Sequence, residues 1–160
     1  MSATAVATAL KNVLKHPVAK YYKYNIISYN ESNVVAKAHI SDARKTSKYE
    51  IHSVNGGAYY LLDLTSYIAA LMQIGEGQTA TTQSINCNVL GTIPLGAEVV
   101  IQANVTPSRH LDHILHLNAT ISLNDKILVT GTIVRSIEIE QSSPLVVNSA
   151  VQSPSEQDSK

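Results

Sequence analysis

Asp63 is the one carboxylate in the most hydrophobic stretch of the sequence, and its position suggests acid–base or nucleophilic chemistry. Apolar residues recur at steps of three and four over residues 58–74, which predicts an α-helix of about five turns. Asp63 lies outside this apolar stripe, on a helix face that it shares with Tyr59 and Ser66. A carboxylate so placed could activate a water molecule or attack an electrophilic carbon itself. It could equally be a structural side chain that is hydrogen-bonded to Tyr or Ser hydroxyl groups.

Two consecutive glycines, Gly56 and Gly57, stand where this helix would begin. Backbone N–H groups at a helix start lack intrahelical acceptors and lie at the positive end of the helix dipole. They can stabilise an oxyanion, for which one donor is typically worth about 3 to 4 kcal/mol, and glycine lets a ligand approach the backbone closely. The alternative is that the pair only makes the turn into the helix. Asn55, directly before it, could cap the helix or donate its side-chain amide to a ligand.

Three histidines, His110, His113 and His116, lie within seven residues and raise the question of a metal site. A spacing of three puts His113 and His116 on opposite faces of a strand. No cysteine lies near them in the sequence, so the residue pattern does not match a zinc site, and we expect no metal.

The rest of the chain predicts elements that would surround the central helix. A helix is expected over 2–15, ended by Pro17, and the central helix should end at Gly75 and Gly77. Strands are expected over 20–30, 33–40, 79–90, 98–106, 115–123 and 127–139, with turns at 30–32 and 124–126 and a loop over 41–50. This order indicates an α+β domain in which a curled antiparallel sheet wraps around one long central helix. A second copy of the chain would cover the other helix face.

Length and composition limit the function classes. The 160 residues suffice for one domain, which we divide into an N-terminal helical extension (1–18), the main domain (19–140) and a disordered tail (141–160). Zero net charge with 15% charged residues argues against a nucleic-acid partner. No run approaches the roughly 20 apolar residues that span a bilayer. The first thirty residues carry lysines and no acid, a feature of mitochondrial transit segments, so we expect a cytoplasmic or mitochondrial protein.

Three segments follow one another in an order and spacing typical of a known family. The glycine pair opens an apolar helix with an early acid, Asp63; a strand over 82–90 ends in a break at Pro94-Leu95-Gly96; and residues 99–135 supply a strand, a short break with a basic residue and two further strands. Over about residues 20–139, this pattern resembles the hotdog fold and, within it, the acyl-CoA thioesterases of the PaaI-like type.

The resemblance implies roles for individual residues. An acid on the central helix acts as nucleophile or general base in the family, which implies Asp63 here. A Ser or Thr on the following strand, from the partner subunit, places the attacking water, which implies Thr82. The amides of Gly56 and Gly57 would bind the oxyanion.

The resemblance also implies a substrate-binding region and shows two departures. Arg109 and His110 match positions where the family binds CoA phosphates, and Tyr59 is expected to contact the substrate. Asn55 stands where the family has a histidine. His52, three residues earlier, could substitute for that histidine. Asp63 is one residue closer to the glycine pair than in the family, which is about 100° of rotation on a helix.

Two functions therefore remain open. One is hydrolysis of acyl-CoA thioesters to free acid and CoA, with no cofactor beyond the CoA part of the substrate, in a homodimer or a dimer of dimers. The other is a hotdog protein that binds acyl-CoA or acts as a scaffold without catalysis, which Asn55 and the offset of Asp63 favour. A hydratase on the same fold ranks last, because no histidine follows Asp63 on its helix.

Overall fold

The computed structural model describes residues 3–40, 54–75, 77–106 and 113–139. Its helices are α1 (Ala3–Lys15), α2 (Pro17–Tyr21) and α3 (Val54–Leu71). Its strands are β1 (Asn25–Tyr29), β2 (Asn33–His39), β3 (Gln78–Val89), β4 (Glu98–Thr106), β5 (Ile114–Leu123) and β6 (Lys126–Ile139). The predictions for the loop 41–50, for Arg109 and His110 and for the tail 141–160 lie outside the described residues.

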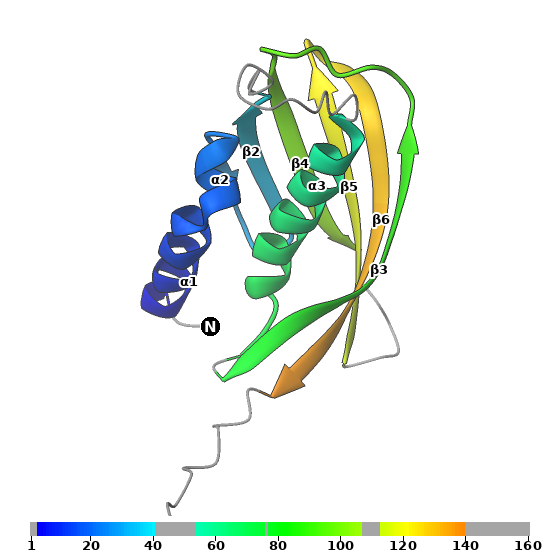
Figure 1. The fold of residues 1–160 in the computed structure, drawn as a ribbon. Helices are drawn as coiled ribbons and strands as arrows, with labels where there is room; N and C mark the ends of the chain where they lie inside the picture. The colour runs from blue at the N-terminus through cyan, green and yellow to red at the C-terminus, as the bar shows by residue number, and fades with distance from the viewer. Residues whose placement is uncertain (1–2, 41–53, 76, 107–112, 140–160) are drawn as a thin grey trace, which may run out of the picture.

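The six strands form one sheet in the order β1-β2-β4-β5-β6-β3, with every neighbouring pair antiparallel. The sheet curls, and α3 lies along its concave side, with β3 bending round toward the helix (Figure 1). The α+β architecture expected from the sequence, a curled antiparallel sheet around one long helix, is confirmed.

Alternating residues of the sheet face α3 and make the core. Every second residue in the middle of β2, β4 and β5 is buried, as strand geometry requires when one sheet face is covered. Opposite them, Leu61, Leu62 and Ile68 of α3 are fully buried. The sheet residues that share this core include Val34, Ala36, Val99, Ile101, Leu117, Ile121, Val129 and Ile133.

The N-terminal part differs from the prediction in one element. Residues 20 and 21 are helical, not extended, and β1 is confined to Asn25–Tyr29. Pro17 ends the first helix as expected but also begins the second, a position at which its missing N–H is tolerated. Lys23, with a φ of 46°, then adopts the left-handed conformation between α2 and β1.

Helix α3 begins at Val54, two residues before the glycine pair, and ends at Leu71 instead of Ile74. Asn55 therefore lies inside the first helical turn, not at the capping position before it. The first four amides of a helix lack intrahelical acceptors. With this start, the N–H group of Gly56 remains among those four, whereas that of Gly57 is the next one along the helix.

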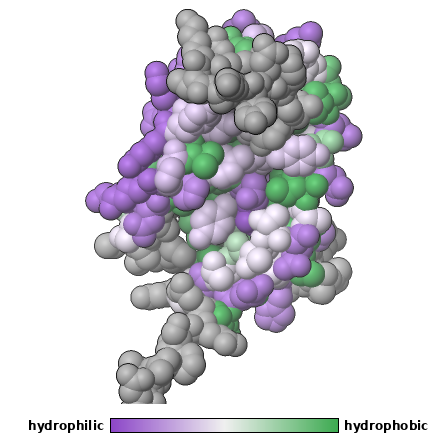
Figure 2. Space-filling model, in the orientation of Figure 1, coloured by the Kyte–Doolittle hydropathy of each residue, from purple (hydrophilic) through white to green (hydrophobic). Residues whose placement is uncertain are grey.

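The chain itself covers much of the second face of α3, for which we expected a second copy. Ser66 and Ala70 on this face are fully buried, and β3 and β6 supply side chains against it. The helices α1 and α2 lie on one side of α3, and Leu10 and Ala19 from them join the core (Figure 1). Hydrophilic residues gather on the outer side of these two helices (Figure 2). None of the described helices is long and apolar enough to cross a membrane.

A buried tyrosine ties the start of β1 to the central helix. The Tyr24 hydroxyl lies 2.9 Å from Thr65 Oγ1, and Thr65 in turn donates to the Leu61 carbonyl at 2.7 Å. Because the single hydroxyl proton of Thr65 is donated to that carbonyl, Tyr24 is the donor in its hydrogen bond with Thr65. Burial raises the pKa of Tyr24 well above its ordinary value, and the hydrogen bond to Thr65 opposes this shift only partly.

We expect the free energy of unfolding to fall as pH rises above about 10, the ordinary phenol pKa, because the unfolded chain then loses a proton that folded Tyr24 keeps. Tyr24→Phe should make this decline shallower, although the variant should be less stable at neutral pH by about 1 kcal/mol through the lost hydrogen bond. Urea unfolding between pH 9 and 11 measures both effects. Tyr29→Phe, at an exposed tyrosine of the edge strand, is the control, and an unchanged slope in Tyr24→Phe would contradict the prediction.

Candidate functional site

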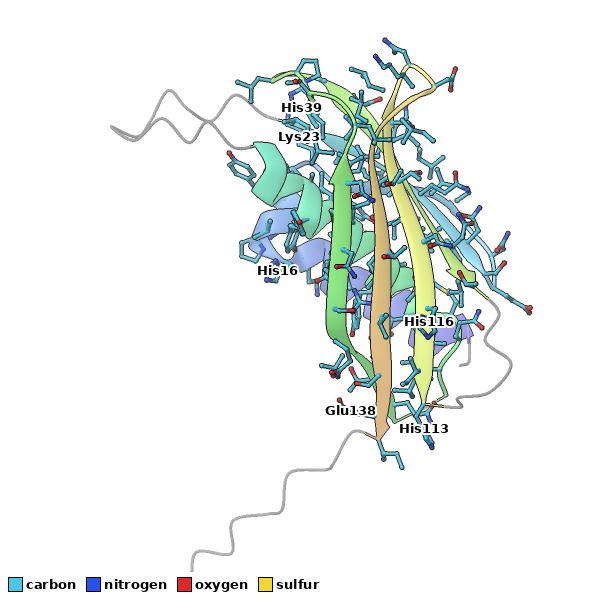
Figure 3. The ribbon with its side chains drawn as sticks, turned by 90° about the vertical axis from the view of Figure 1, so that its right-hand side faces the viewer. His16, Lys23, His39, His113, His116 and Glu138 are labelled. Carbon is cyan, nitrogen blue, oxygen red and sulfur yellow. The ribbon has the colours of Figure 1, made fainter. Side chains whose placement is uncertain are left out.

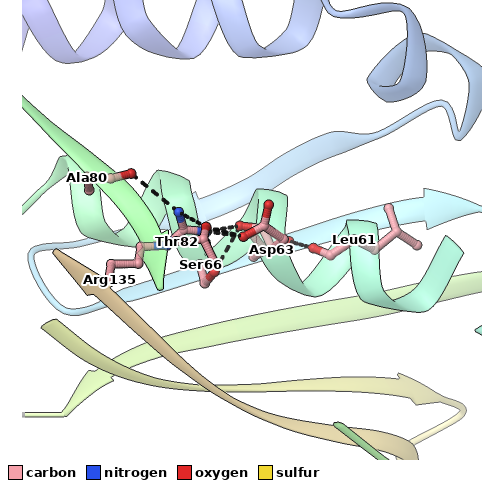
Figure 4. Close-up of polar contacts among 7 residues, drawn as sticks. Leu61, Asp63, Ser66, Ala80, Thr82 and Arg135 are labelled. Carbon is pink, nitrogen blue, oxygen red and sulfur yellow. Dashed lines mark hydrogen bonds and ion pairs between the residues drawn. The ribbon is translucent and has the colours of Figure 1, made fainter. Parts of the chain in front are cut away.

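Asp63 lies in a closed ring of hydrogen bonds formed by three elements (Figure 4). Its Oδ1 accepts a hydrogen bond from Thr82 Oγ1 of β3 at 2.8 Å and another from Arg135 Nη2 of β6 at 2.5 Å. Thr82 Oγ1 accepts from Arg135 Nη1 at 2.7 Å and so closes the ring. Thr82 reaches the Asp63 of its own chain, whereas the resemblance implied a threonine from the partner subunit.

Arg135 is buried to all but 2% of its surface, and both terminal nitrogens of its guanidinium group donate hydrogen bonds. Its Nη2 also donates to the Asp63 carbonyl at 2.6 Å and to Ser66 Oγ at 2.9 Å, and its guanidinium carbon lies 5.4 Å from the centroid of the Tyr67 ring. Burial lowers the pKa of Arg135, and the charge and hydrogen bond of Asp63 oppose that shift. Among the described residues, its Nε has no hydrogen-bond partner.

The sheet register explains how Thr82 and Arg135 meet. The two residues lie directly opposite each other where β3 pairs with β6. The register shifts between Thr82 and Ser84, so the intervening Gln83 is the extra residue of a β-bulge. Its amide donates to Ser136 Oγ at 2.7 Å on the outer face. The bulge lets inward-facing positions continue along β3 while the strand bends around the helix.

The second carboxylate oxygen of Asp63 is available for chemistry. Oδ2 accepts no hydrogen bond from the described part of the chain, and the Asp63 side chain is 38% exposed. An ionised carboxylate with one oxygen held and the other open can accept a proton from water or attack a carbonyl carbon. Tyr60, one helical turn earlier, has a pKa raised by burial and further by the charge of Asp63, so its phenol stays neutral.

The start of α3 is packed against the N-terminal helices. A Cβ at Gly57 would lie 2.4 Å from the Tyr22 hydroxyl, so only glycine allows this close approach. Tyr22 stacks on Tyr60 with ring centroids 6.3 Å apart, and the Tyr60 hydroxyl lies 3.1 Å from His16 Nδ1. Within this chain, Gly57 therefore has a packing role.

Of the predicted site residues, the structure brings Asp63 and Thr82 together. Gly57 lies six residues before Asp63, about 9 Å along the helix axis at about 1.5 Å per residue. Asn55 and Gly56 share the first helical turn with Gly57. Tyr59 is 42% exposed, and it partly offsets the rise that burial causes in the pKa of Cys87 of β3, so it lies on the β3 side of the helix.

Arg135 is the site residue that sequence reasoning missed. The alternation in β6 holds a signal for it, because Val129, Gly131 and Ile133 are buried and Arg135 is the next residue in the same inward-facing series. An arginine in the inward series of a core strand must find a counter-charge.

The histidines form no metal site in the part of the chain that is described. His113 and His116 are exposed near one end of β5 (Figure 3). Among the described residues, no group of three His, Cys, Asp or Glu side chains is placed to hold a metal ion.

The unequal burial of Asp63 and Arg135 predicts unequal effects of breaking their ion pair. Asp63→Leu leaves a buried guanidinium without a counter-ion and should lose about 3–5 kcal/mol of unfolding free energy. Arg135→Met leaves a carboxylate that water can reach, so it should lose less. The double variant should recover much of the loss, because an apolar pair can replace a buried ion pair at little cost. Urea unfolding of the three variants tests this order.

The exposed pair Lys37–Glu98, 2.8 Å apart on the same sheet, is the matched control for that series. Lys37→Met and Glu98→Leu should each change stability little, because both side chains are largely in water. Equal losses for Asp63→Leu and Arg135→Met, or no recovery in the double variant, would contradict the burial argument.

Gly57→Ala should destabilise the protein although alanine is the better helix former by about 1 kcal/mol. The added methyl group meets the Tyr22 hydroxyl, and such overpacking typically costs about 1–3 kcal/mol. In a Tyr22→Phe background the hydroxyl is gone and the penalty should shrink. Thermal unfolding of the two single variants and the double variant measures this coupling, and a penalty independent of Tyr22 would refute it.

Comparison with known proteins gives the fold but no close relative. The sequence matches no model of a protein family and no curated protein. The structure is similar to a thioesterase from Haemophilus influenzae (TM-score 0.67, 16% identity, covering 84% of this chain and 92% of that one). It is also similar to a phenylacetic acid degradation-related protein from Ralstonia eutropha (TM-score 0.67, 17% identity, covering 82% and 98%). A third similar structure is a Streptococcus mutans protein bound to acetyl CoA (TM-score 0.61, 16% identity, covering 72% and 89%). The chain therefore has the hotdog fold of thioesterase-family structures, as its sequence pattern implied.

Proposed function

We propose that the protein hydrolyses acyl-CoA thioesters to a free acid and CoA. The observation that carries this proposal is the state of Asp63, whose Oδ1 is held by Thr82 and Arg135 while Oδ2 is open and the side chain is partly exposed. A carboxylate fixed in this way, on the central helix of a hotdog fold, is suited to act on a carbonyl carbon bound beside it.

In the proposed reaction, Asp63 Oδ2 takes a proton from a water molecule as the water oxygen attacks the thioester carbonyl carbon. The carbonyl oxygen becomes an oxyanion, which unpaired amides at the start of an α3 helix stabilise. The carbon–sulfur bond then breaks, and the electron pair leaves with CoA as a thiolate. Because a thiol has an ordinary pKa of about 8.5, the thiolate is a good leaving group. The chemistry needs no cofactor beyond the CoA part of the substrate.

We further propose that each active site forms between two copies of the chain. Within one chain, the amides of Gly57 and Gly56 lie about 9 and about 10.5 Å along the helix from Asp63, too far for these amides and the carboxylate to contact one carbonyl group. A second copy could bring its own glycine pair to this carboxylate, in a homodimer or a dimer of dimers. Asn55, beside the pair, would then be placed to donate its amide to the same carbonyl.

The substrate class rests on the fold and on a CoA-type ligand in a similar structure. The Streptococcus mutans protein is bound to acetyl CoA, which supports a CoA-type ligand for this chain as well. We assign the phosphates of CoA to Arg109 and His110, and contact with the acyl group to Tyr59, whose ring is exposed on the β3 side of α3.

A second candidate function is binding of acyl-CoA without hydrolysis, and two observations favour it. Asp63 Oδ1 is paired with a buried arginine of its own chain. The space beside Gly57 is filled by the Tyr22 hydroxyl, which restricts the approach of a ligand to that amide.

Release of free thiol from a panel of acyl-CoAs tests hydrolysis directly. The wild type should release thiol from at least one of them well above background, and Asp63→Asn should reduce kcat by about 100-fold or more because general base or nucleophilic catalysis is lost. Glu98→Gln makes the same carboxylate-to-amide change at an exposed position and should retain the full rate.

Two results would overturn the hydrolytic assignment. One is the absence of turnover with every acyl-CoA in the panel. The other is an Asp63→Asn variant that is folded, as judged by its thermal unfolding, and as active as Glu98→Gln. Tight binding of an acyl-CoA without turnover would establish the second candidate instead.

A further inference from the structure

We propose that Arg135 is a positioning residue, which selects Oδ2 of Asp63 as the atom that acts on the substrate. This inference rests on the proposed hydrolysis and assigns to β6, the last of the described strands, a role in the active site.

A free carboxylate presents two equivalent oxygens and can rotate about its last bond. Here Arg135 Nη2 and Thr82 both donate to the same oxygen, at 2.5 and 2.8 Å, and Arg135 Nη1 fixes Thr82 at 2.7 Å. The carboxylate plane is therefore locked, and only one oxygen is left with its lone pairs free.

The planar shape of the Arg135 guanidinium group allows it to contact α3 and β3 at the same time. Its Nη2 donates hydrogen bonds to the side chain and the carbonyl of Asp63 and to Ser66, all on α3. Its Nη1 donates to two residues of β3, to Thr82 and, more weakly, to the Ala80 carbonyl at 3.4 Å. A planar fork with donors in fixed directions can bridge a helix and a strand in this way. A lysine ammonium is a compact point charge on a flexible stem and cannot hold all these acceptors at once.

The burial of Arg135 prevents direct contact with a ligand. Arg135 is 2% exposed, beneath Asp63, so it is shielded from any ligand that Asp63 could meet. It acts on the substrate only through Asp63. Its loss should therefore change the rate of the chemical step and leave substrate binding nearly unchanged, whereas a residue that contacts CoA would change both.

This arrangement leaves one nitrogen of the Arg135 guanidinium group unsatisfied among the described residues. Arg135 Nε is buried and has no hydrogen-bond partner in the described part of the chain. A buried polar group without a partner is unfavourable. The unsatisfied Nε accompanies a placement in which both terminal nitrogens are directed at Asp63 and Thr82, as a role in orienting Asp63 requires.

Arg135→Lys is the central test, because it keeps the charge and removes the fork. We expect kcat for the best acyl-CoA of the panel to fall by about 10- to 100-fold, since small misplacement of a reacting group has effects of this size. KM, and the Kd for a thioether analogue of that acyl-CoA that cannot be hydrolysed, should stay within about threefold of the wild-type values. Lys37→Met is the control, because it changes an exposed cationic side chain on the same sheet, and it should leave kcat unchanged.

A second variant separates positioning from stability. Arg135→Ala opens a space of the size of the side chain, and added guanidinium ion, at concentrations well below those that unfold the protein, should restore part of kcat. Ammonium ion at the same concentration should not. A variant that is merely less stable would be further destabilised by guanidinium, so rescue is a result that a purely structural role does not produce.

The outcomes separate this inference from the proposed function. If the wild type hydrolyses acyl-CoA and folded Arg135→Lys keeps kcat within threefold, Arg135 is structural and this inference is wrong while hydrolysis stands. A parallel rise of KM and Kd for the thioether analogue would show that Arg135 affects binding, which also overturns it. If the wild type hydrolyses nothing, the proposed function itself fails and the positioning role goes with it.

Discussion

A charged guanidinium in the core is the constraint on which the rest of this structure depends. Arg135 is as deeply buried as the leucines and isoleucines around it, and a charge in such a place is tolerated only when it is paired and hydrogen-bonded. Asp63 supplies the counter-charge from the helix, and Thr82 completes the contacts from the neighbouring strand. The same contacts that make the arginine tolerable also fix the orientation of the acid. Stability and the placement of the candidate catalytic group therefore have one physical origin.

Much of the fold could be predicted because it follows from local patterns. The period of the apolar residues gave the helix around Asp63, and the alternation from Glu98 onward gave antiparallel strands, both of which the structure confirms. The strand expected over 20–30 was wrong in its first half, because a proline that ends one helix can begin another, as Pro17 does. A second copy of the chain was expected to cover the outer face of the helix, but β3 and the N-terminal helices of the same chain cover much of it. This could not be predicted, because the packing of these elements on the helix is a long-range contact that leaves no period in the sequence.

The candidate site could be predicted only in part for a similar reason. Periodicity tells which face a residue lies on but not which strand lies beside it. Thr82 meets Arg135 because β3 pairs with β6, three strands later, and not with β4, which follows it in the chain. The contact of Gly57 with Tyr22 likewise joins segments distant in sequence. The inward series of β6 holds a signal for a buried charge at Arg135, which sequence reasoning missed, and the sequence does not say that its counter-charge is Asp63.

The place of β6 in the sheet also bears on how the protein is made. Asp63 and Arg135 are separated by 72 residues, and among the described strands β3 pairs with β6 alone. As the chain leaves the ribosome, α3 and β3 emerge long before the strand that joins β3 to the rest of the sheet and neutralises the acid. Until then the nascent protein carries an open twelve-residue strand with unpaired backbone groups, a state prone to aggregation. Because β6 joins β3 to the rest of the sheet, the sheet can close around α3 only after β6 has been synthesised.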